Sequence, residues 1–578
     1  MEELSYRERT TALQEMASSG VDILVIGGGI TGAGIALEGA AHGFKTGLVE
    51  KADFASGTSS KSTKLVHGGI RYLPQFDFAL VREALVERGL LTRNAPFLVQ
   101  PIGFVLPLYK GAKRPLGTPI SPPGGIGMSY VLLSGLMMYD MLAGRLGVGR
   151  HRRLGPQRAL RMVPCLKQEG LADAFIYYDA QTDDTRLTST VVRTAASKGA
   201  LLANYAEVTG FVQAGSRIVG AHVRDVLSGE TLTINAGAVV NAAGVFAGRV
   251  ESMGGNDSQV KIEPAKGIHL TVPRSVLKIG KDAVVLPETD DGRILFIVPW
   301  GPRVTIGTTD TPGGDIDHPV AGDEDVDYLL RHVNRYMSCR LTRADIISTW
   351  AGYRPLVSSR KPGVSSSKLS RSHVVLDGPG GMVTVVGGKL TTYRRMGQDA
   401  IDHLANRLGK RVSHLTERLP LVGSEAWEQA AKQVQAAAPA YGWQAGTVRR
   451  LGTYGSSALT ILQLAEEDPA LAHLVVADLP YVMAEVVFAC RYEMAIQLDD
   501  VLERRLHIRF EDWDHGLGVA PDVAAVMAGE LGWTPAEESA QVARYKQIVQ
   551  QDEPERSGND GDTGAHPKNA EHEALPHA

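Results

Sequence analysis

Apolar and polar positions along the chain follow two different rhythms. Over residues 21–420, short runs of β-branched and other apolar residues alternate with glycine turns and with segments whose apolar residues recur at helical spacing. This alternation is typical of an α/β fold. Over residues 425–550 only the helical spacing remains, which predicts a separate helical domain. Residues 1–20 predict a short leading helix or arm, and residues 552–578, which lack aromatic side chains, are expected to be disordered.

The first apolar run leads into the most informative turn of the chain. It ends in a glycine cluster in which Gly27, Gly29 and Gly32 fit the spacing G-x-G-x-x-G. Gly27 permits the tight turn from strand to helix, Gly29 lets a pyrophosphate approach the backbone, and Gly32 allows the helix to pack closely on the strand. The next apolar run ends at Glu50, which is placed to accept hydrogen bonds from a ribose diol. Together these features predict a site for an ADP-containing dinucleotide.

Two later segments favour FAD over NAD as that dinucleotide. Residues 233–248 form an apolar run that ends in small residues, and residues 382–401 have the pattern of a strand, a Gly-Gly-Lys turn and a helix. An NAD site closes within one contiguous block, whereas FAD gains from a second helix N-terminus near its isoalloxazine ring. The hydroxyl-rich residues 56–73 add donors that suit pyrophosphate and the flavin edge. From the residues alone, ordinary βα turns remain an alternative for these segments.

Composition and cysteine usage exclude several classes of protein. The 578 residues carry a formal net charge of −4, which argues against a general nucleic-acid binder, and no apolar run is long enough to span a bilayer. Cys165, Cys339 and Cys490 form no C-x-x-C pair, so we expect neither a disulfide framework nor a metal site. The polar N-terminal residues contain no secretory signal. We therefore expect a cytoplasmic protein, or one attached peripherally to the cytoplasmic face of the inner membrane.

Further motifs carry a specific resemblance. The segments HGGIRYL, AKGIHL, GTTDTP, AGYRPL, SRSHVV and GGKLTTYR follow one another in this order, and the helical AEVVFACRYEMAIQLDDVLERR comes after them. Over residues 21–510 the chain thereby resembles the FAD-dependent, quinone-linked glycerol-3-phosphate dehydrogenases of the glycine/D-amino-acid oxidase superfamily. The resemblance implies a Rossmann-like βαβ FAD-binding domain, discontinuous within residues 21–420, with a mixed-sheet substrate cap and a C-terminal all-α domain. It also implies oxidation of sn-glycerol 3-phosphate to dihydroxyacetone phosphate, with electrons passed from FAD to a membrane quinone.

That reaction needs a base, a cation near the developing alkoxide and cationic groups for the phosphate. The resemblance assigns His269 as the base for the C2 hydroxyl proton and Arg354 as the cation beside the reacting hydroxyl. Taken alone, His269 at a strand start is more typical of a packing residue, and Arg354 is equally typical of a structural ion pair. For Asp310 we favour a role in stabilising a sharp turn. The substrate contacts that the resemblance implies are Arg71, Tyr72, Arg371 and Lys389.

The expected FAD contacts come from the glycine turn and from the resemblance. His67 invites a catalytic interpretation, but the two glycines after it favour close backbone approach, so we treat it as a flavin contact. Val208 belongs to a segment expected to meet the adenine through backbone groups. The complete set is Gly27, Gly29, Thr31, Gly32, Glu50, Thr58, Ser59, Lys64, His67, Gly68, Gly69, Val208, Gly387 and Leu390.

Residues 128–144 offer a physical basis for contact with a membrane. The segment is strongly apolar, too short to span a bilayer and interrupted by Asp140, and basic residues from Lys110 to Arg161 flank it. An apolar face beside basic residues suits peripheral attachment to anionic lipid. A buried helix of the substrate cap beside a solvated arginine loop is the slightly favoured alternative.

Other functions stay open at this point. A glycerol-3-phosphate oxidase would pass the electrons to oxygen, and an amine- or amino-acid-oxidising flavoenzyme would share the superfamily. A cluster of cations without a nearby acid suits a phosphate substrate better than an amino acid. Another alternative is a non-enzymatic interaction module, in which FAD would only complete the core. A further one is a nicotinamide dehydrogenase, which would lack bound flavin. The sequence sets neither the quinone nor the oligomeric state, and a homodimer is compatible with it.

Overall fold

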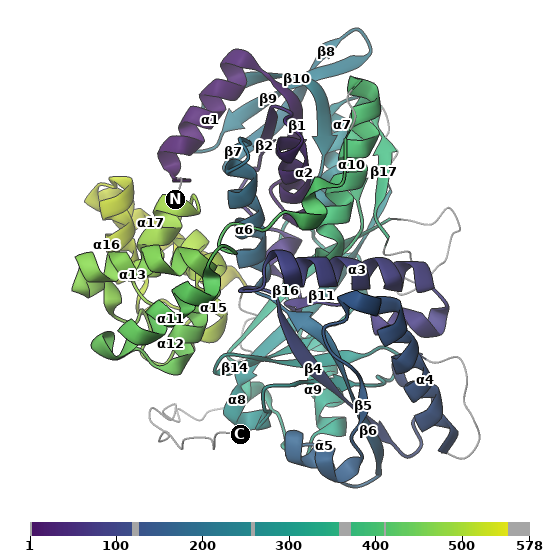
Figure 1. Cartoon of the computed structure of the whole chain (residues 1–578). Helices are drawn as coiled ribbons and strands as arrows, with labels where there is room; N and C mark the ends of the chain where they lie inside the picture. Colours follow the sequence, from purple (N-terminus) through teal and green to yellow (C-terminus); the bar gives the residue numbers. More distant parts are fainter. Residues whose placement is uncertain (1–2, 118–125, 256–260, 358–371, 410–411, 553–578) are drawn as a thin grey trace.

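The structure is a computed structural model that describes residues 3–117, 126–255, 261–357, 372–409 and 412–552. Figure 1 shows one sheet with its helices in the upper part of the molecule, a second sheet with its helices below, and a group of helices on one flank. The predicted α/β fold with a helical C-terminal part is confirmed. Arg371 and the tail from residue 553 onward lie outside the described residues.

The first sheet contains the strand that leads into the Gly27 turn. Its five central strands are parallel, and an antiparallel strand and a hairpin extend it. The strand order is β17 (Val374–Asp377), β18 (Val383–Val386), β10 (Thr231–Asn241), β1 (Val21–Ile26), β2 (Thr46–Val49) and β7 (Leu201–Ala203). Segments far apart in the sequence therefore meet beside β1, as a discontinuous domain requires.

Helices cover both faces of this sheet. On one face lie α2 (Ile30–Ala41), α6 (Asp184–Ala196) and α10 (Tyr393–Leu408). On the other lie α1 (Tyr6–Ser19) and the hairpin of β8 (Ala206–Ala214) and β9 (Arg217–Asp225). Because α2 follows β1 and α10 follows the parallel β18, the N-termini of both helices lie at the carboxyl edge of the sheet, where ligands bind in such folds.

Glycines let α2 and α10 cross at close range. A Cβ atom on Gly397 would lie 2.6 Å from the carbonyl oxygen of Gly34, and one on Gly34 would lie 2.8 Å from the ring of Tyr393. Any larger side chain at the crossing would separate the two helices. The crossing therefore fixes the two helix N-termini relative to each other.

The second sheet is mixed and forms the cap. Its strand order is β15 (Thr311–Pro312), β11 (Ile262–Pro273), β14 (Arg303–Gly307), β13 (Leu295–Trp300), β12 (Ala283–Leu286), β4 (Gln100–Tyr109), β6 (Leu171–Gln181) and β3 (Leu65–Val66). Strand β16 (Ser348–Val357) pairs with β11, and β5 (Arg152–Arg153) pairs with β6. One face packs on α5 (Pro156–Met162), α8 (Arg274–Leu277) and α9 (Asp323–Tyr336), and the other on α3 (Phe78–Asn94) and α4 (Ile126–Ala143).

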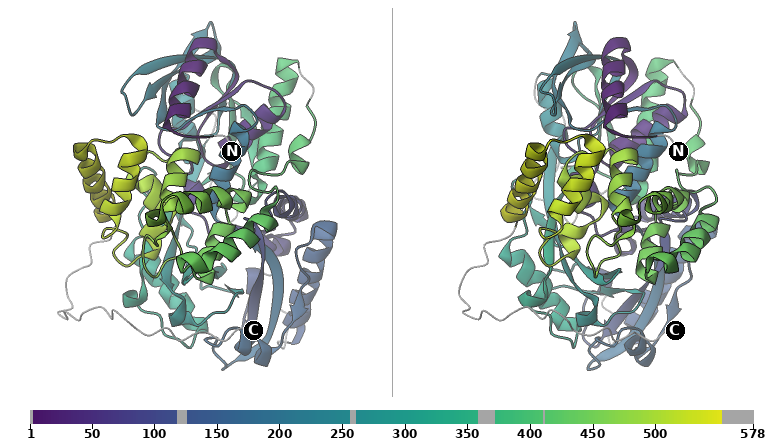
Figure 2. Two further views of the ribbon diagram at one scale, coloured as in Figure 1. Left: turned by 60° about the vertical axis from the view of Figure 1, so that its left-hand side comes forward. Right: turned by 90° about the vertical axis from the view of Figure 1, so that its left-hand side faces the viewer.

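The helical part lies along one flank, against both sheets (Figure 2). It contains α11 (Trp427–Ala437), α12 (Ala445–Gly452), α13 (Ala458–Glu467), α14 (Ala484–Tyr492), the π-helical η14 (Asp500–Arg505), α15 (Ile508–Glu511), α16 (Ala520–Leu531) and α17 (Pro535–Asp552). The N-terminal segment is joined to it, because Leu4 donates to Arg491 O at 3.0 Å and accepts from Met494 N at 2.8 Å. None of the described helices combines the length and the hydrophobicity that crossing a bilayer requires.

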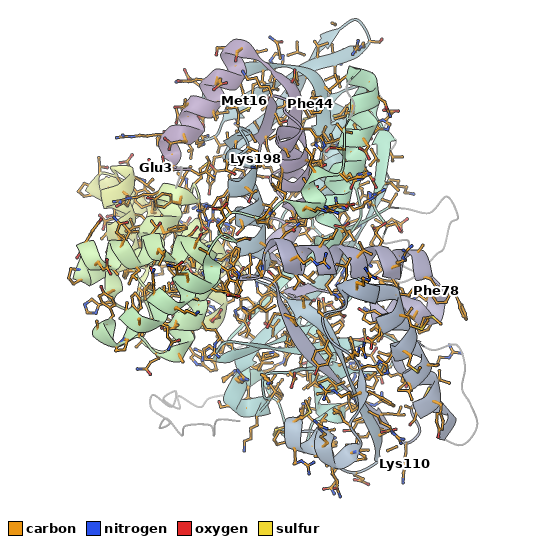
Figure 3. The ribbon with its side chains drawn as sticks, viewed as in Figure 1. Glu3, Met16, Phe44, Phe78, Lys110 and Lys198 are labelled. Carbon is orange, nitrogen blue, oxygen red and sulfur yellow. A yellow bond between two sulfur atoms is a disulfide. The ribbon has the colours of Figure 1, made fainter. Side chains whose placement is uncertain are left out.

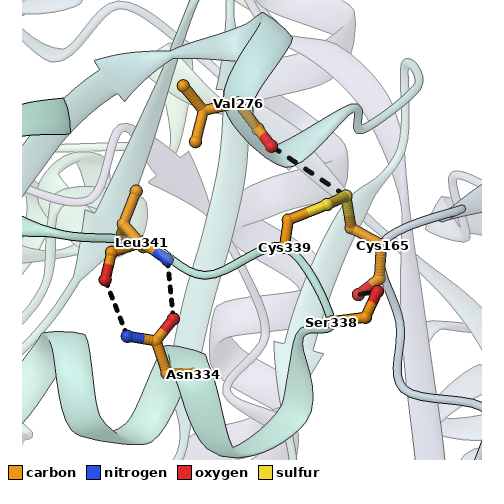
Figure 4. The surroundings of a disulfide bond; sticks show 6 residues. All are labelled: Cys165, Val276, Asn334, Ser338, Cys339 and Leu341. Atoms are coloured by element: carbon orange, nitrogen blue, oxygen red, sulfur yellow. Dashed lines mark hydrogen bonds between the residues drawn. A yellow bond between two sulfur atoms is a disulfide. The ribbon is translucent and has the colours of Figure 1, made fainter.

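The expectation that the cysteines stay unpaired is wrong. Cys165, just after α5, and Cys339, just after α9, form a disulfide bond (Figure 4), with Cα atoms 5.5 Å apart and a sequence separation of 174. Ser338 donates its backbone N–H to Cys165 O at 2.7 Å, and Asn334 holds the same loop through two hydrogen bonds with Leu341. Sequence spacing concealed the pair, because the packing of α5 and α9 on the same face of the cap sheet, and not proximity along the chain, brings the two loops together.

Breaking this disulfide is expected to lower the free energy of unfolding by about 2–4 kcal/mol, because the bond closes a long loop in the unfolded chain. Urea unfolding of the wild type with and without reductant, and of Cys339→Ser, checks this. The double variant Cys165→Ser/Cys339→Ser is the control, and reductant should leave its midpoint unchanged. Equal midpoints for the oxidised wild type and Cys339→Ser would contradict a stabilising role.

Candidate active site

A cavity of about 580 Å³ is lined by residues of both sheets. The first sheet contributes the carboxyl ends of β1, β2 and β10 with the loops that follow them, and the cap contributes β11, β16 and the loop after β14. Residues far apart in the sequence thus share one cavity. The predicted site residues in its lining are Gly27, Gly29, Thr31, Glu50, Thr58, Ser59, His67, Gly69, Arg71, Tyr72, Val208, His269, Arg354, Gly387, Lys389 and Leu390.

The glycine turn has the geometry of a dinucleotide cradle. Gly27 has a φ of +110°, and a Cβ atom there would lie 2.7 Å from the carbonyl oxygen of Ala242. A Cβ atom on Gly32 would lie only 1.8 Å from the carbonyl oxygen of Gly27, so the third glycine is needed for α2 to pack on the turn and does not itself line the cavity. These glycines leave room for a pyrophosphate at the N-terminus of α2.

Glu50 lies beside this cradle. Its Oε2 accepts the backbone N–H of Gly28 at 2.6 Å, and its Oε1 accepts that of Ala52 at 3.0 Å. Burial raises the pKa of Glu50, although both hydrogen bonds oppose the shift. A half-buried carboxylate in the cavity wall can accept hydrogen bonds from the hydroxyl groups of a ribose. The cradle and Glu50 together fit the ADP half of FAD.

A second glycine turn closes the cavity from the side of β18. Gly387 has a φ of +82°, and a Cβ atom there would lie 2.8 Å from the carbonyl oxygen of Ser372. Thr391, just after this turn, accepts the backbone N–H of His67 on its Oγ1 at 3.1 Å. The loop that follows β3 is thereby tied to the start of α10, and both line the cavity.

Strand pairing places His269 and Arg354 on one face of the cap sheet. In the register of β11 and β16, His269 is opposite Trp350 and Gly267 is opposite Gly352, while Arg354 is opposite Ala265, two pairs further on and so on the same face. Both glycines leave space: a Cβ atom on Gly267 would lie 2.5 Å from the Arg354 guanidinium. His269, expected at a strand start, is in fact in the middle of β11. The imidazole and the guanidinium both line the cavity, where a small substrate can meet them.

His269 is a buried, neutral imidazole. Its Nε2 shares a hydrogen bond with the Thr63 hydroxyl at 2.9 Å, and its ring stacks on Trp350 with the centroids 5.2 Å apart. Burial, and then the charges of Arg354 and Lys64, lower its pKa to about 3. Below a pH of about 6.5 the unfolded chain binds a proton that the folded chain does not, so His269 makes the protein less stable as the pH falls.

Arg354 is held from behind. Its Nη1 donates to Thr309 O at 3.3 Å and to Asp310 Oδ1 at 3.4 Å, and its Nη2 donates to Thr308 Oγ1 at 3.1 Å. Asp310, for which we favoured a turn, thus contacts the site through Arg354. The charge-assisted contacts fix the guanidinium plane at the edge of the cavity.

A second cationic group lines the same cavity. The ammonium of Lys389 lies 4.6 Å from the centroid of the Tyr72 ring, and Arg71 donates to the Tyr72 hydroxyl at 2.7 Å. Arg71 also lies over the same ring, at 4.9 Å. Two cations that share one phenol, all in the cavity lining, form a site suited to an anion such as a phosphate.

Two other predicted FAD contacts lie outside the cavity lining. The ammonium of Lys64 pairs with Asp184 at 2.6 Å and lies 5.1 Å from the Trp300 ring, so the geometry does not support a direct contact with FAD. A Cβ atom on Gly68 would collide with Leu85 and Tyr139, so this glycine serves the packing of α3 and α4.

The sequence prediction missed several lining residues. Thr63 and Phe246 lie within residues 56–73 and 233–248, which we had singled out, but neither residue was chosen. Phe296, Thr308 and Lys61 also line the cavity. The direction of the Phe296 side chain depends on the pairing of β13 with β14, which the sequence does not reveal, whereas Lys61 and Thr308 lie in loops of segments that we had singled out. Among the described residues, no group of three or more histidine, cysteine, aspartate or glutamate side chains could hold a metal ion.

Comparisons with known proteins agree with this geometry. A family model described as FAD dependent oxidoreductase matches residues 22–394, and one described as the C-terminal domain of alpha-glycerophosphate oxidase matches residues 414–538. Glycerol-3-phosphate dehydrogenase 2 of Mycobacterium bovis is 38% identical over 548 residues, which cover 94% of this chain and 90% of that protein. The probable mitochondrial glycerol-3-phosphate dehydrogenase of Caenorhabditis elegans is 35% identical, with 91% and 73% covered.

A solved structure is similar over nearly the same extent. The glycerol-3-phosphate dehydrogenase of Bacillus halodurans, complexed with FAD, superimposes with a TM-score of 0.76 and 30% identity. The match covers 95% of this chain and 98% of that one. The similarity therefore includes the parallel sheet, the cap and the helical part.

Proposed function

The chain belongs to the FAD-dependent glycerol-3-phosphate dehydrogenases, and from this premise we propose that it oxidises sn-glycerol 3-phosphate to dihydroxyacetone phosphate and passes the electrons to a membrane quinone. The observation that carries the substrate proposal is the meeting of His269, Arg354 and the Arg71–Tyr72–Lys389 group in one cavity with the dinucleotide cradle. A secondary alcohol with a phosphate needs such a base and such cations.

Each residue has one task in the proposed reaction. His269 accepts the C2 hydroxyl proton on Nε2, and Arg354 stabilises the negative charge that grows on the C2 oxygen. Arg71, Tyr72 and Lys389 hold the phosphate, so that the C2–H bond is kept in a fixed orientation. FAD, when bound, supplies the acceptor for the hydride. Thr63 keeps Nε2 of His269 directed into the cavity.

The rate of flavin reduction at saturating glycerol 3-phosphate is expected to show no acid limb from His269 above a pH of about 5. With a pKa of about 3, the imidazole stays unprotonated through the range in which a free histidine titrates. Anaerobic stopped-flow measurements from pH 5 to about 9 check this. A limb that persists in His269→Gln belongs to the substrate phosphate, whereas a limb near pH 6.5 that disappears in that variant would contradict the prediction.

An amino-acid substrate is less well supported by the site. Such a substrate needs an acceptor for its ammonium, and Asp179, an acid in the cavity lining, already accepts Arg88 at 2.6 Å and the Tyr139 hydroxyl at 2.8 Å. The cations of the cavity suit a doubly charged phosphate better than a single carboxylate. Turnover of glycerol 3-phosphate against glycine and proline separates the two, and faster turnover of an amino acid would reject the proposed substrate.

The electron acceptor is tested by reoxidation. We expect the reduced protein to reduce a soluble quinone analogue faster than oxygen and to release little peroxide. Reoxidation by oxygen with one peroxide per substrate would instead support a glycerol-3-phosphate oxidase. Both rates are measured after the flavin has been reduced with glycerol 3-phosphate in the absence of oxygen.

Helix α4 and its neighbours present a surface that suits a membrane. One face of α4 is buried through Leu132, Leu136 and Tyr139, while the other exposes Met141, at 78%, and further apolar side chains. Phe78, at the start of α3, lies at the outer edge of the molecule on the same side (Figure 3). Exposed arginines follow α4 directly. The exposed apolar residues of this surface are Phe76, Phe78, Tyr130, Met137, Met138 and Met141.

We expect the protein to sediment with anionic liposomes at low salt and to be released at high salt, because basic side chains and an apolar face act together. The variant Met137→Ser/Met141→Ser should bind several-fold more weakly, and Val320→Ser, an exposed apolar residue elsewhere, should bind like the wild type. Failure of the wild type to bind at low salt would reject the membrane contact.

A further inference from the structure

One segment of the helical part reaches the wall of the cavity. Helices η14 and α15 lie against the loop of residues 51–64, which connects β2 to β3 and contributes a run of lining residues. Figure 2 shows the helical part along the flank where the two sheets meet. Residues 500–511 therefore contact a loop that lines the cavity, although all the lining residues lie between positions 26 and 391.

The most direct contact is an ion pair between Glu503 and Lys61. Both side chains are nearly buried, at 7% and 12% exposure, and Lys61 is itself part of the cavity lining. The Lys61 ammonium also lies 4.6 Å from the centroid of the Phe510 ring. Lys61 crosses β16 at Gly352, where a Cβ atom would lie 2.6 Å from the Lys61 Cβ. The lysine is thus clamped between the helical part and the cap.

Two further contacts join the same segment to the site. Asp53, three residues after Glu50, accepts Arg504 Nε at 2.7 Å and Arg505 Nη1 at 2.8 Å. On the cap side, Phe510 packs on Trp350 with ring centroids 5.3 Å apart, and Trp350 carries the His269 ring. The segment therefore supports the cradle side and the cap side of the cavity at once.

Glu503 is ionised in this setting. Burial opposes its ionisation, but the charges of Lys61, Arg509 and Arg504 outweigh that effect and lower the pKa of Glu503 below its usual value. Removing one charge from a group of buried ion pairs changes the electrostatics around it strongly. Loss of the Glu503 charge would remove one negative charge from the side of Lys61 and make the surroundings of the cavity wall more positive.

We propose that Glu503 is a positioning residue of the flavin site, which holds Lys61 in the cavity wall and so sets how tightly FAD binds and how readily it is reduced. Reduction places negative charge on the cofactor, and the loss of the negative charge of Glu503 beside Lys61 favours it. Removal of Lys61 acts in the opposite direction. The proposal needs only bound FAD, so it does not depend on the substrate or the electron acceptor.

The test compares Glu503→Gln and Lys61→Met in the full-length protein, by titrating the bound flavin against a redox dye and by measuring the FAD dissociation constant. At a fixed potential, the ratio of reduced to oxidised flavin should rise about threefold or more in Glu503→Gln and fall by a similar factor in Lys61→Met. Both variants should bind FAD more weakly. Glu530→Gln, which breaks an ion pair to Arg491 inside the helical part, is the matched control and should change neither quantity.

Two results would overturn the proposal. The first is that both variants keep the redox ratio and the FAD affinity of the wild type. The Lys61–Glu503 ion pair would then only link the helical part to the loop. The second is that the redox ratio shifts in the same direction in both variants. The two substitutions remove opposite charges, so a common direction would show a loosened site and not an effect of charge. If Glu503→Gln fails to fold, Lys61→Met and Glu503→Asp replace it. Lys61→Met alone must then lower the ratio, and Glu503→Asp must restore most of the wild-type behaviour; otherwise the proposal fails.

Discussion

Replacing His269 with glutamine is expected to slow flavin reduction by sn-glycerol 3-phosphate by about 10²–10⁴-fold while FAD remains bound. The imidazole is the neutral base in the cavity lining, and Nε2 is the nitrogen that hydrogen-bonds the Thr63 hydroxyl. Glutamine keeps a polar group of similar size but cannot take up a proton. Anaerobic stopped-flow absorbance measures the rate, and the ratio of flavin to protein absorbance measures the bound cofactor.

The control for this experiment is a buried histidine that does not line the cavity. His332 is 1% exposed, lies on α9 and accepts the backbone N–H of Asp290 at 3.0 Å. His332→Gln is expected to cost some stability and to leave the rate of flavin reduction unchanged. If His269→Gln reduced its flavin at the wild-type rate, His269 would not be the base. If it lost its flavin, His269 would be part of the cofactor scaffold.

Replacing Gly32 with alanine is expected to remove bound FAD almost completely. The added Cβ atom would lie 1.8 Å from the carbonyl oxygen of Gly27, well inside contact distance, and this backbone oxygen cannot turn aside. To relieve the clash, α2 has to move away from β1, which displaces the helix N-terminus that faces the pyrophosphate. A loss of about 2 kcal/mol or more in binding corresponds to at least about a 30-fold weaker FAD affinity. Flavin content after purification and FAD titration of the apoprotein measure it.

Gly529 offers the matched control, because it is also a helical glycine. It lies in α16 of the helical part, and a Cβ atom there would meet nothing within 4 Å. Gly529→Ala is therefore expected to keep full flavin content and to stabilise its helix slightly. Stoichiometric FAD with unchanged affinity in Gly32→Ala would show that α2 does not position the cofactor as we describe.

The cradle could be predicted from the sequence because its parts are close together in the chain. Gly27, Gly29 and Gly32 lie within six residues, and Glu50 follows one helix later. Local rules for turns and helix starts apply over such distances. The positive φ of Gly27 and the close approach at Gly32 agree with the turn and packing tasks that the spacing suggested, and the cofactor contacts of Gly29 and Glu50 stay predictions.

The wall of the cavity that the cap sheet forms could not be predicted from local patterns in this way. His269 faces the cavity because β11 pairs with β16 and β14, so its direction depends on segments that begin 34 and 79 residues away. A shift of one residue in either register would turn the imidazole to the other face. Only the resemblance of AKGIHL and AGYRPL to a known family selected His269 and Arg354 beforehand. Lys64 shows the limit of that approach, since its side chain pairs with Asp184 behind the wall.

Long-range pairings were the least predictable features. The Cys165–Cys339 bond and the Lys61–Glu503 pair each join segments that no local pattern connects. The helical spacing of apolar residues predicted that this part is helical. It did not indicate which of its segments contacts the cavity. These contacts follow from the packing of whole domains, which a single sequence does not specify by inspection.

The central claim is that an alcohol bound between His269 and Arg354 reduces the bound flavin. Mixing the purified yellow protein with sn-glycerol 3-phosphate in the absence of oxygen tests it most directly. We expect the flavin absorbance to bleach at a rate that saturates with substrate, while the opposite enantiomer bleaches it far more slowly. Absorbance that stays unchanged with sn-glycerol 3-phosphate, or that bleaches equally with both enantiomers, would contradict the account.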